Sequence, residues 1–275
     1  MNILEIKNLE IASNNGVVLH DLSLSIKPGE RLGLIGESGS GKSVTALTVM
    51  GLLPSSLTAK GQVLVSNGES GPIDVISAQE GTLNKIRGDV VSIVFQEPLT
   101  ALDPLMRIGK QIEEPLRRHQ KLRGADLSAA VVAALEEVRI DNPKRIAQAF
   151  PHEISGGERQ RAAIAMALSC QPALLIADEP TTALDVTVQA EILDLLDSLV
   201  ARHNMSMLFI SHDLAVVARI TNSVMVLKDG EVVEAGSLHD ILQTQTNSYT
   251  RELVASARQL DDALNLASLR AEHDK

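Results

Sequence analysis

The sequence predicts an α/β fold with a mainly parallel core sheet, an added antiparallel β subdomain and an inserted α-helical subdomain. Short apolar runs, such as residues 31–35 and 173–177, alternate with loops and helical segments, as buried parallel strands do. The first 26 residues alternate apolar and polar side chains, which is typical of antiparallel strands with one solvated face. Residues 105–150 carry apolar residues at helical spacing and no strand pattern.

The elements can be assigned in order along the chain. We expect strands over 2–11, 17–26 and 31–35, a helix ending at Leu53, a strand over 90–95, helices within 105–150, a strand over 173–177, a long helix over 186–203, a strand over 205–210 and a hairpin over 224–233. Pro28-Gly29 ends the second strand, and Pro54 stops the first helix. Asp229-Gly230 is a strong signal for a two-residue hairpin turn. From Tyr249 onward we expect a polar helical tail at the periphery.

Composition and charge limit the possible functions. The 275 residues allow one large domain or two small ones, and the formal net charge is −10. That charge disfavours broad binding to nucleic acid, which needs clustered Lys and Arg, but it allows one tight nucleotide site. The single cysteine, Cys170, excludes an intramolecular disulfide and four-cysteine metal sites, and it fits a reducing cytosol. We expect neither a signal peptide nor a membrane span.

Residues 36–43 read Gly-Glu-Ser-Gly-Ser-Gly-Lys-Ser and match the phosphate-loop pattern G-x-x-x-x-G-K-[ST]. The alternative is a Ser/Gly linker with a chance lysine. The predicted buried strand before these residues and the predicted helix after them favour the phosphate loop. The backbone N–H groups are expected to hold ATP phosphates, with Lys42 on the β and γ oxygens and the Ser43 hydroxyl on Mg²⁺. The predicted phosphate-binding residues are Gly36, Glu37, Ser38, Gly39, Ser40, Gly41, Lys42, Ser43 and Val44.

Asp178 and Glu179 stand at the end of the apolar strand that begins near residue 173. Asp178 is expected to hold Mg²⁺ directly or through water, and Glu179 to polarise an attacking water as a general base. An isolated Asp-Glu pair would more simply be a solvated strand end. Its combination with a phosphate loop favours the catalytic interpretation.

Residues 155–160 read Ser-Gly-Gly-Glu-Arg-Gln and resemble the signature motif of the ATP-binding cassette (ABC) family. Other motifs of that family follow in order. Gln96 resembles its Q-loop glutamine, residues 183–185 (Ala-Leu-Asp) resemble its D-loop, and His212 resembles its switch histidine. Each of these alone would be an ordinary loop, cap or structural residue, but their joint order indicates the family.

This resemblance covers roughly residues 2–250. It implies a P-loop NTPase of ABC type, with an ATPase domain over 1–250, a helical subdomain inserted at about 97–155 and a helical tail over 251–275. ATP and Mg²⁺ are the implied cofactors. The implied catalytic residues are Glu179, His212 and Gln96, and the implied metal-side residues are Ser43, Gln96 and Asp178.

The signature residues Ser155, Gly156, Gly157 and Glu158 begin a helix, whose free N–H groups form a second anion site. In the family, this site engages the γ-phosphate of ATP bound to a partner cassette. The chain is therefore expected to act as a dimer with a second ABC ATPase subunit, either homomeric or heteromeric.

Several short sequence segments make the resemblance more specific, because they are similar to segments of the ATPase subunits of dipeptide, oligopeptide and nickel importers. They lie at residues 95–104, 150–153, 177–189 and 249–251. This likeness implies integral membrane permeases as partners, with residues 97–120 receiving a permease coupling helix. It also implies an indirectly coupled extracytoplasmic solute-binding protein, no nucleic acid partner, and a peripheral position on the cytoplasmic face of the membrane. Peptides are the expected substrate, and nickel or another small solute is the alternative.

Two features depart from the family pattern. Ser13 stands where the family usually places an aromatic residue that stacks on adenine, so Val17 or Val18 is expected to contact the base instead. The chain also lacks the clustered cysteines that many peptide-importer subunits carry near their C-terminus.

Two other functions stay open from the sequence. One is a non-transport cassette ATPase of translation or DNA repair, which the acidic charge and the absence of sustained heptads disfavour. The other is a partner-binding subunit without catalysis. The intact set of Lys42, Asp178, Glu179 and His212 disfavours that alternative.

Overall fold

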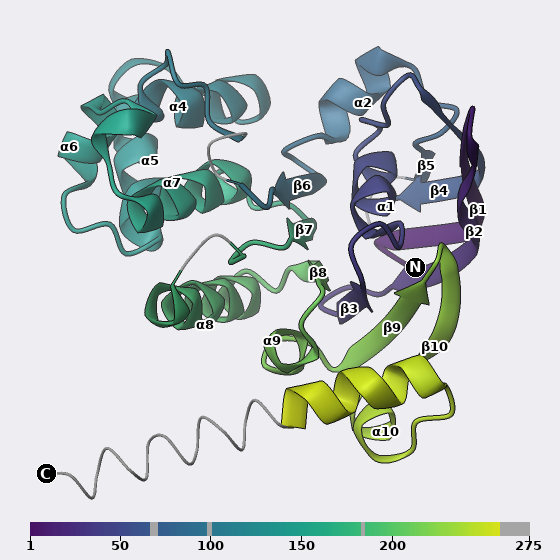
Figure 1. The fold of residues 1–275 in the computed structure, drawn as a ribbon. Coiled ribbons are helices and arrows are strands. Elements are labelled where there is room, and N and C mark those ends of the chain that lie inside the picture. The colour runs from purple at the N-terminus through teal and green to yellow at the C-terminus, as the bar shows by residue number, and fades with distance from the viewer. Residues whose placement is uncertain (67–70, 98–100, 183–184, 259–275) are drawn as a thin grey trace, which may run out of the picture.

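A computed structural model describes residues 1–66, 71–97, 101–182 and 185–258 (Figure 1). The strands are β1 (Leu4–Ser13), β2 (Gly16–Ile26), β3 (Arg31–Gly36), β4 (Leu57–Val65), β5 (Ile73–Asp74), β6 (Val91–Val94), β7 (Leu174–Asp178), β8 (Ser206–Ser211), β9 (Ser223–Lys228) and β10 (Glu231–Ser237). The helices are α1 (Lys42–Val49), α2 (Glu80–Ile86), α4 (Ile108–His119), α5 (Gly124–Glu137), α6 (Pro143–Gln148), the 3₁₀ helix η1 (Pro151–Glu153), α7 (Gly156–Leu168), α8 (Val186–Arg202), α9 (Leu214–Ala218) and α10 (Leu238–Gln243). This arrangement confirms the predicted fold class.

The six-stranded sheet has the order β10-β9-β3-β8-β7-β6. Its strands pair in parallel except for β10, which pairs with β9 in antiparallel fashion through the predicted hairpin. Alternate residues of β7 enter two different cores: Leu175 and Ala177 join one cluster, and Leu174 and Ile176 join the other. Because both faces are covered, the strand reads as a continuous apolar run.

A second, antiparallel sheet has the order β2-β1-β4-β5. Leu4 of β1 lies opposite both Ile26 of β2 and Val65 of β4, so β1 lies between these two strands. The two opening strands were predicted from their alternation. The strand β4 and the helix α2 were not predicted from the sequence.

Helices α4, α5, α6 and α7 gather at one side of the molecule, away from the antiparallel sheet (Figure 1). Apolar residues at helical spacing within 105–150 are buried in one cluster, which includes Ile108, Ile112, Val131 and Leu135. The helical prediction for residues 105–150 is therefore confirmed. The domain boundaries at about 97, 155 and 251 stay predictions.

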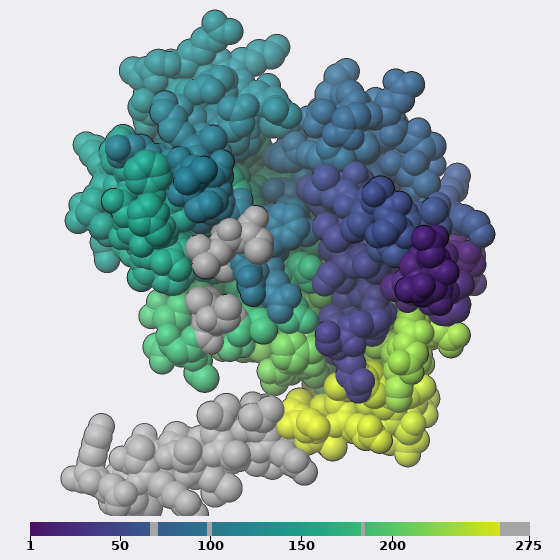
Figure 2. Space-filling model, turned by 45° about the horizontal axis from the view of Figure 1, so that its top comes forward, coloured from purple at the N-terminus to yellow at the C-terminus, as the bar shows by residue number. Residues whose placement is uncertain are grey.

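A C-terminal helix begins at Ser248 and is described as far as Arg258. The expectation of a peripheral tail is wrong for its first part, because Tyr249, Thr250 and Val254 are 4%, 0% and 3% exposed. In the space-filling view this yellow helix lies against the indigo region that carries the phosphate loop (Figure 2). The rest of the predicted tail, residues 259–275, lies outside the described residues.

The turn before this helix explains why the chain folds back. The Glu234 carboxylate on β10 accepts hydrogen bonds from the Thr246 and Asn247 backbone N–H groups at 2.8 and 3.2 Å, and from the Thr246 hydroxyl at 2.9 Å. These donors oppose the effect of burial, and the pKa of Glu234 lies below its usual value. A carboxylate that satisfies several donors fixes the direction in which the helix starts.

None of the helices in the described part of the chain is long and apolar enough to cross a membrane.

Candidate nucleotide-binding site

The phosphate loop joins the end of β3 to the start of α1. Gly41 occupies the N-cap of α1 with a positive φ of 101°, and no side chain caps the helix. A Cβ at this position would lie 2.8 Å from the Leu19 Cδ1 atom, so only glycine fits without displacing the side chain. The first N–H groups of α1 therefore remain available to an anion.

Lys42 is 4% exposed, and its ammonium group donates to the backbone carbonyls of Gly36 (2.7 Å) and Glu37 (2.8 Å). Burial lowers the pKa of Lys42, and the carboxylates of Glu179, Asp178 and Glu37 oppose that effect. The loop's own carbonyls thus hold a buried cation beside the uncapped helix terminus, where a phosphate would be favoured.

Ser43 and Asp178 meet across the sheet edge. The Ser43 hydroxyl donates to Asp178 Oδ1 at 3.2 Å. Asp178 ends β7 and is 7% exposed; burial raises its pKa, and the Ser43 hydrogen bond partly opposes that rise. This pair places a hydroxyl and a carboxylate oxygen side by side next to the phosphate loop.

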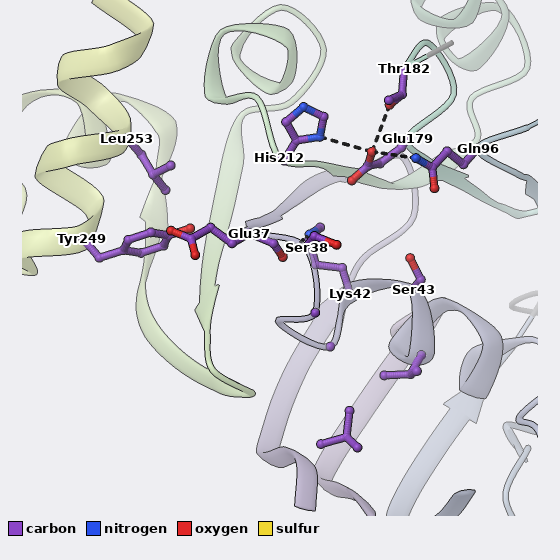
Figure 3. A pocket seen from close by; sticks show the side chains of 14 residues that line it. Glu37, Ser38, Lys42, Ser43, Gln96, Glu179, Thr182, His212, Tyr249 and Leu253 are labelled. Carbon is purple, nitrogen blue, oxygen red and sulfur yellow. Dashed lines mark hydrogen bonds and ion pairs between the residues drawn. The ribbon is translucent and has the colours of Figure 1, made fainter. Parts of the chain in front are cut away.

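Glu179 follows Asp178 in a left-handed conformation with a φ of 47°, which is uncommon for a residue other than glycine. Its backbone N–H donates to the Ile210 carbonyl at 2.9 Å. Its Oε2 atom accepts hydrogen bonds from Gln96 Nε2 (3.3 Å) and the Thr182 hydroxyl (2.9 Å), and it lies 3.2 Å from His212 Nδ1. Figure 3 shows these three side chains converging on the carboxylate.

These groups surround a pocket of about 580 Å³ at the carboxyl edge of the parallel sheet (Figure 3). It is lined by Val18, Glu37, Ser38, Gly39, Gly41, Lys42, Ser43, Val44, Gln96, Glu179, Thr182, His212, Tyr249 and Leu253. The convergence follows from the topology, because the loops after parallel strands β3, β6, β7 and β8 all leave the sheet at this edge.

Two residues of the predicted phosphate-binding set, Gly36 and Ser40, are not among the lining residues. Ser40 is 3% exposed, and its hydroxyl has no hydrogen-bond partner among the described residues. Asp178 is also not a lining residue, but it accepts a hydrogen bond from Ser43, which does line the pocket.

The signature residues lie apart from this pocket. Ser155 is the N-cap of α7, and its hydroxyl accepts a hydrogen bond from the Glu158 N–H at 3.2 Å. The Glu158 carboxylate accepts one from the Ser155 N–H at 2.8 Å and one from Arg145 at 2.9 Å. None of the residues 155–158 lines the pocket that holds Lys42. The N-terminus of α1 and the N-terminus of α7 therefore lie at separate places on one chain.

Sequence reasoning missed three lining residues: Thr182, Tyr249 and Leu253. Thr182 lies three residues after Glu179, and this proximity was the signal that could have identified it. Tyr249 and Leu253 reach the pocket only through tertiary packing. Of the residues proposed to contact a base, Val18 lines the pocket, while Val17 is 44% exposed and does not.

The predicted D-loop is described only in part. Ala183 and Leu184 lie outside the described residues. Asp185 is the N-cap of α8, and its carboxylate accepts a hydrogen bond from the Val188 N–H at 3.0 Å.

A loop of backbone N–H groups at a helix terminus, a buried lysine, and an Asp-Glu pair at the end of β7, which β8 separates from β3, define the class of P-loop nucleoside triphosphatases. The family model described as "ABC transporter" matches residues 19–182. The chain therefore belongs to the ABC transporter family, and it is an ATPase of that family.

Curated relatives agree with this assignment. A protein of Brucella ovis described as a peptide import ATP-binding protein is 43% identical over 270 residues, covering 96% of this chain and 80% of the relative. The glutathione import ATP-binding protein GsiA of Salmonella choleraesuis is 42% identical, covering 94% of this chain but 42% of the relative. The peptidoglycan transport ATP-binding protein YejF of Agrobacterium fabrum is 43% identical, with 92% and 47% covered.

Solved structures share the fold. The ATP-binding cassette MJ0796, in a dimeric post-hydrolysis state bound to ADP and Pi, has a TM-score of 0.72 and 32% identity, covering 86% of this chain and 98% of that one. The protein cbiO1 of Clostridium perfringens, part of the transporter complex cbiONQ, has a TM-score of 0.73 and 26% identity, with 99% and 98% covered.

Proposed function

We propose that this chain is the ATP-hydrolysing subunit of an ABC importer and that it energises the uptake of peptides through partner permeases. The names of its relatives support this proposal, since they are peptide, glutathione and peptidoglycan transport ATP-binding proteins. The site supports the catalytic part independently, because its groups fit ATP hydrolysis.

In the proposed mechanism, the backbone N–H groups of the phosphate loop hold the β-phosphate. Lys42 leaves the carbonyls of Gly36 and Glu37 and donates instead to the β and γ oxygens. The exchange is favourable because a phosphate carries full negative charge, whereas a carbonyl carries only a partial one.

The residues present fit Mg²⁺ as the second cofactor. Ser43 and Asp178 supply a hydroxyl and a carboxylate oxygen 3.2 Å apart, and Gln96 lies at the same edge with an amide oxygen. Mg²⁺ prefers such oxygen ligands, takes few from the protein, and completes its shell with waters and substrate phosphates. When bound, it would neutralise charge on the phosphates.

The single observation that carries the catalytic proposal is the placement of the Glu179 carboxylate. It lies in the wall of the pocket that Lys42 lines, held by Gln96, Thr182 and His212 from three separate segments. A carboxylate fixed in this way can accept the proton of a water that attacks the γ-phosphate. His212, which is half exposed, lies where it can contact the same phosphate.

The signature residues Ser155, Gly156, Gly157 and Glu158 complete the site of a partner cassette in this proposal. They lie outside the pocket of their own chain, so their free helix terminus is open to a second subunit. The dimeric state of the similar cassette MJ0796 supports this arrangement.

We place the chain on the cytoplasmic face of the membrane, held there by integral membrane permeases and coupled through them to an extracytoplasmic solute-binding protein. A candidate contact for the permeases lies just before α4. Leu105 is 88% exposed and Met106 is 41% exposed, which is unusual for large apolar side chains and favours a covered surface.

The test of the catalytic proposal is Glu179→Gln. This change keeps the size of the side chain but removes the base, so kcat should fall by about 10²- to 10⁴-fold while the Kd for ATP stays nearly constant. Dimers that require ATP should accumulate. Steady-state phosphate release, equilibrium ATP binding and light scattering measure these three quantities.

Asp194→Asn is a matched control, since Asp194 is an exposed carboxylate on α8 that pairs with Arg219 away from the pocket. It should hydrolyse ATP at the unmodified rate. Near-normal hydrolysis by the Glu179→Gln protein would rule out the general-base role.

The transported solute is tested separately with the partner permeases in membrane vesicles. Uptake of a labelled oligopeptide that depends on ATP and is lost in Glu179→Gln would support the peptide assignment. Uptake of nickel without uptake of peptides would overturn it in favour of the alternative.

A further inference from the structure

The side chain of Tyr249 is not explained by the hydrolysis mechanism. It comes from the C-terminal helix, is 4% exposed, and lines the nucleotide pocket together with Leu253. Its hydroxyl is buried and has no hydrogen-bond partner among the described residues. Figure 3 shows the ring pointing toward Glu37 of the phosphate loop. A buried hydroxyl without a partner costs free energy, so its retention at this position calls for an explanation.

The ring is held in place from outside the pocket. The Lys228 ammonium group lies 4.8 Å from the ring centroid, and the Glu234 carboxylate fixes the turn that precedes the helix. The hydroxyl therefore cannot easily move to find a partner, and any partner must come to it.

Glu37 of the phosphate loop lines the same pocket as Tyr249, and its carboxylate and its backbone N–H both act on the hydroxyl (Figure 3). Burial, with the Glu37 carboxylate, raises the pKa of the Tyr249 phenol, although the Glu37 backbone N–H opposes this rise, and the phenol therefore stays protonated at neutral pH. The two peptide carbonyls on either side of that N–H, those of Gly36 and Glu37, are the groups that bind the Lys42 ammonium. When a phosphate binds Lys42, the Gly36 carbonyl loses this contact, while the Glu37 carbonyl keeps the hydrogen bond from the Ser40 N–H at 3.2 Å, so the Gly36–Glu37 peptide is less restrained than before.

We propose that Tyr249 is a positioning residue for the phosphate loop: when nucleotide occupies the pocket, the Glu37 backbone N–H donates a hydrogen bond to the Tyr249 hydroxyl. The inference rests on the proposed nucleotide binding and deepens it. Its consequence is that the C-terminal helix is tied to the state of the loop, so nucleotide occupancy alters a segment about 200 residues further along the chain.

The sequence makes this contact directly observable, since Tyr249 is the only tyrosine and the chain has no tryptophan. Incorporation of 3-fluorotyrosine into the full chain therefore gives a single ¹⁹F resonance. We expect saturating Mg²⁺-ADP to shift this resonance, with a midpoint equal to the Kd measured by calorimetry. In the Lys42→Ala protein, the shift should require correspondingly more nucleotide.

Tyr249→Phe removes only the hydroxyl and keeps the ring under Lys228. We expect the KM for ATP to rise about fivefold while kcat changes less than about twofold, because one neutral hydrogen bond to the binding loop is lost. Val254→Ala is the matched control. Val254 is buried in the same helix but does not line the pocket, so its truncation should lower Tm and leave the KM for ATP unchanged.

The outcomes separate the two proposals. If calorimetry shows ADP binding but the ¹⁹F resonance and the KM of Tyr249→Phe stay constant, the positioning role is wrong and the ATPase assignment stands. If Val254→Ala raises the KM as much as Tyr249→Phe, the effect is packing of the helix and the positioning role is again wrong. If ADP does not bind, both proposals fail.

Discussion

The proposed mechanism assigns a phosphate to the N-termini of two helices, α1 and α7, and these two termini are capped in opposite ways. Helix α1 begins after Gly41, which has no side chain and makes no cap hydrogen bond. Helix α7 begins after Ser155, whose hydroxyl accepts from the Glu158 N–H while the Glu158 carboxylate accepts from the Ser155 N–H. This second arrangement is a capping box.

In the proposed mechanism, this difference explains why the α1 terminus binds nucleotide alone and the α7 terminus completes the site of a partner subunit. At α1 the uncapped N–H groups and the buried Lys42 ammonium group together favour the binding of an anion. At α7 the Ser155 and Glu158 side chains already bind part of the helix terminus, and the nearby cation of Arg145 is paired with the Glu158 carboxylate. The remaining N–H groups of α7 favour a phosphate that another subunit already holds.

The largest expected effect comes from Gly157→Asp, which places a negative charge at the α7 terminus. ATP hydrolysis should fall more than about 100-fold, because the charge repels the γ-phosphate of the partner's nucleotide. ATP binding to the monomer should be nearly unchanged, since the phosphate loop is intact. Phosphate release and calorimetric titration measure the two effects.

Gly157→Ala controls for size, because a Cβ at this position would lie 3.3 Å from the Val188 Cγ1 atom, a tight contact without charge. It should retain much more hydrolysis than Gly157→Asp. The claim that α7 acts on the partner's nucleotide fails if monomeric protein hydrolyses ATP at a rate per chain that does not change on dilution.

The next effect is that of Lys42→Ala at the other terminus. The Kd for ATP should rise about 10- to 100-fold, because a buried charge-assisted contact to the phosphates is lost. Equilibrium binding of a fluorescent ATP analogue measures it. An unchanged Kd would show that the backbone N–H groups alone carry binding at α1.

Mixing Lys42→Ala with Gly157→Asp subunits tests whether the two composite ATP sites of a dimer depend on each other. In a mixed dimer, one composite site pairs an intact phosphate loop with an intact signature, and the other site carries both lesions. Recovered hydrolysis would show that the two sites work independently. No recovery in a mixture proven to dimerise would show that they act together.

The phosphate loop and its surroundings could be predicted because their signals are local. A buried strand, a glycine-rich loop and a helix follow one another within residues 31–49, and the carboxylate pair directly ends its strand. The parallel topology then brings these segments to one edge. Local pattern and fold agree here, so the prediction of Lys42, Ser43 and Glu179 as neighbours of one pocket matches the geometry.

The strand β4 and the burial of Tyr249 could not be predicted, for different physical reasons. The strand β4 contains Gly61, a residue type depleted in strands, whose positive φ of 102° and close approach to the Asn8 carbonyl lie opposite a register shift in β1. The burial of Tyr249 has no local signal, because it depends on the Glu234 carboxylate, which turns the chain back, and on a loop far away in sequence.

The smallest expected effect comes from the capping box itself, through Glu158→Gln. The hydrogen bond from the Ser155 backbone lowers the pKa of Glu158, with help from the Ser155 hydroxyl and Arg145 and against a smaller effect of burial. Because the pKa in the folded state lies below the unfolded value of about 4.3, the carboxylate stabilises the fold above that value. This contribution is lost as the pH falls through the folded pKa.

Glu158→Gln should therefore lower stability by about 0.5 kcal/mol at pH 7, since the group is partly solvated, and lower Tm by about 1–2 °C. The difference from the unmodified chain should shrink below about pH 4, where the carboxylate of the unmodified chain becomes protonated. Thermal unfolding of both proteins between pH 7 and pH 3 measures it. A Tm difference that stays constant over that range would mean that the charge of Glu158 does not stabilise α7, and that the Ser155 hydroxyl alone distinguishes this terminus from the glycine-capped start of α1.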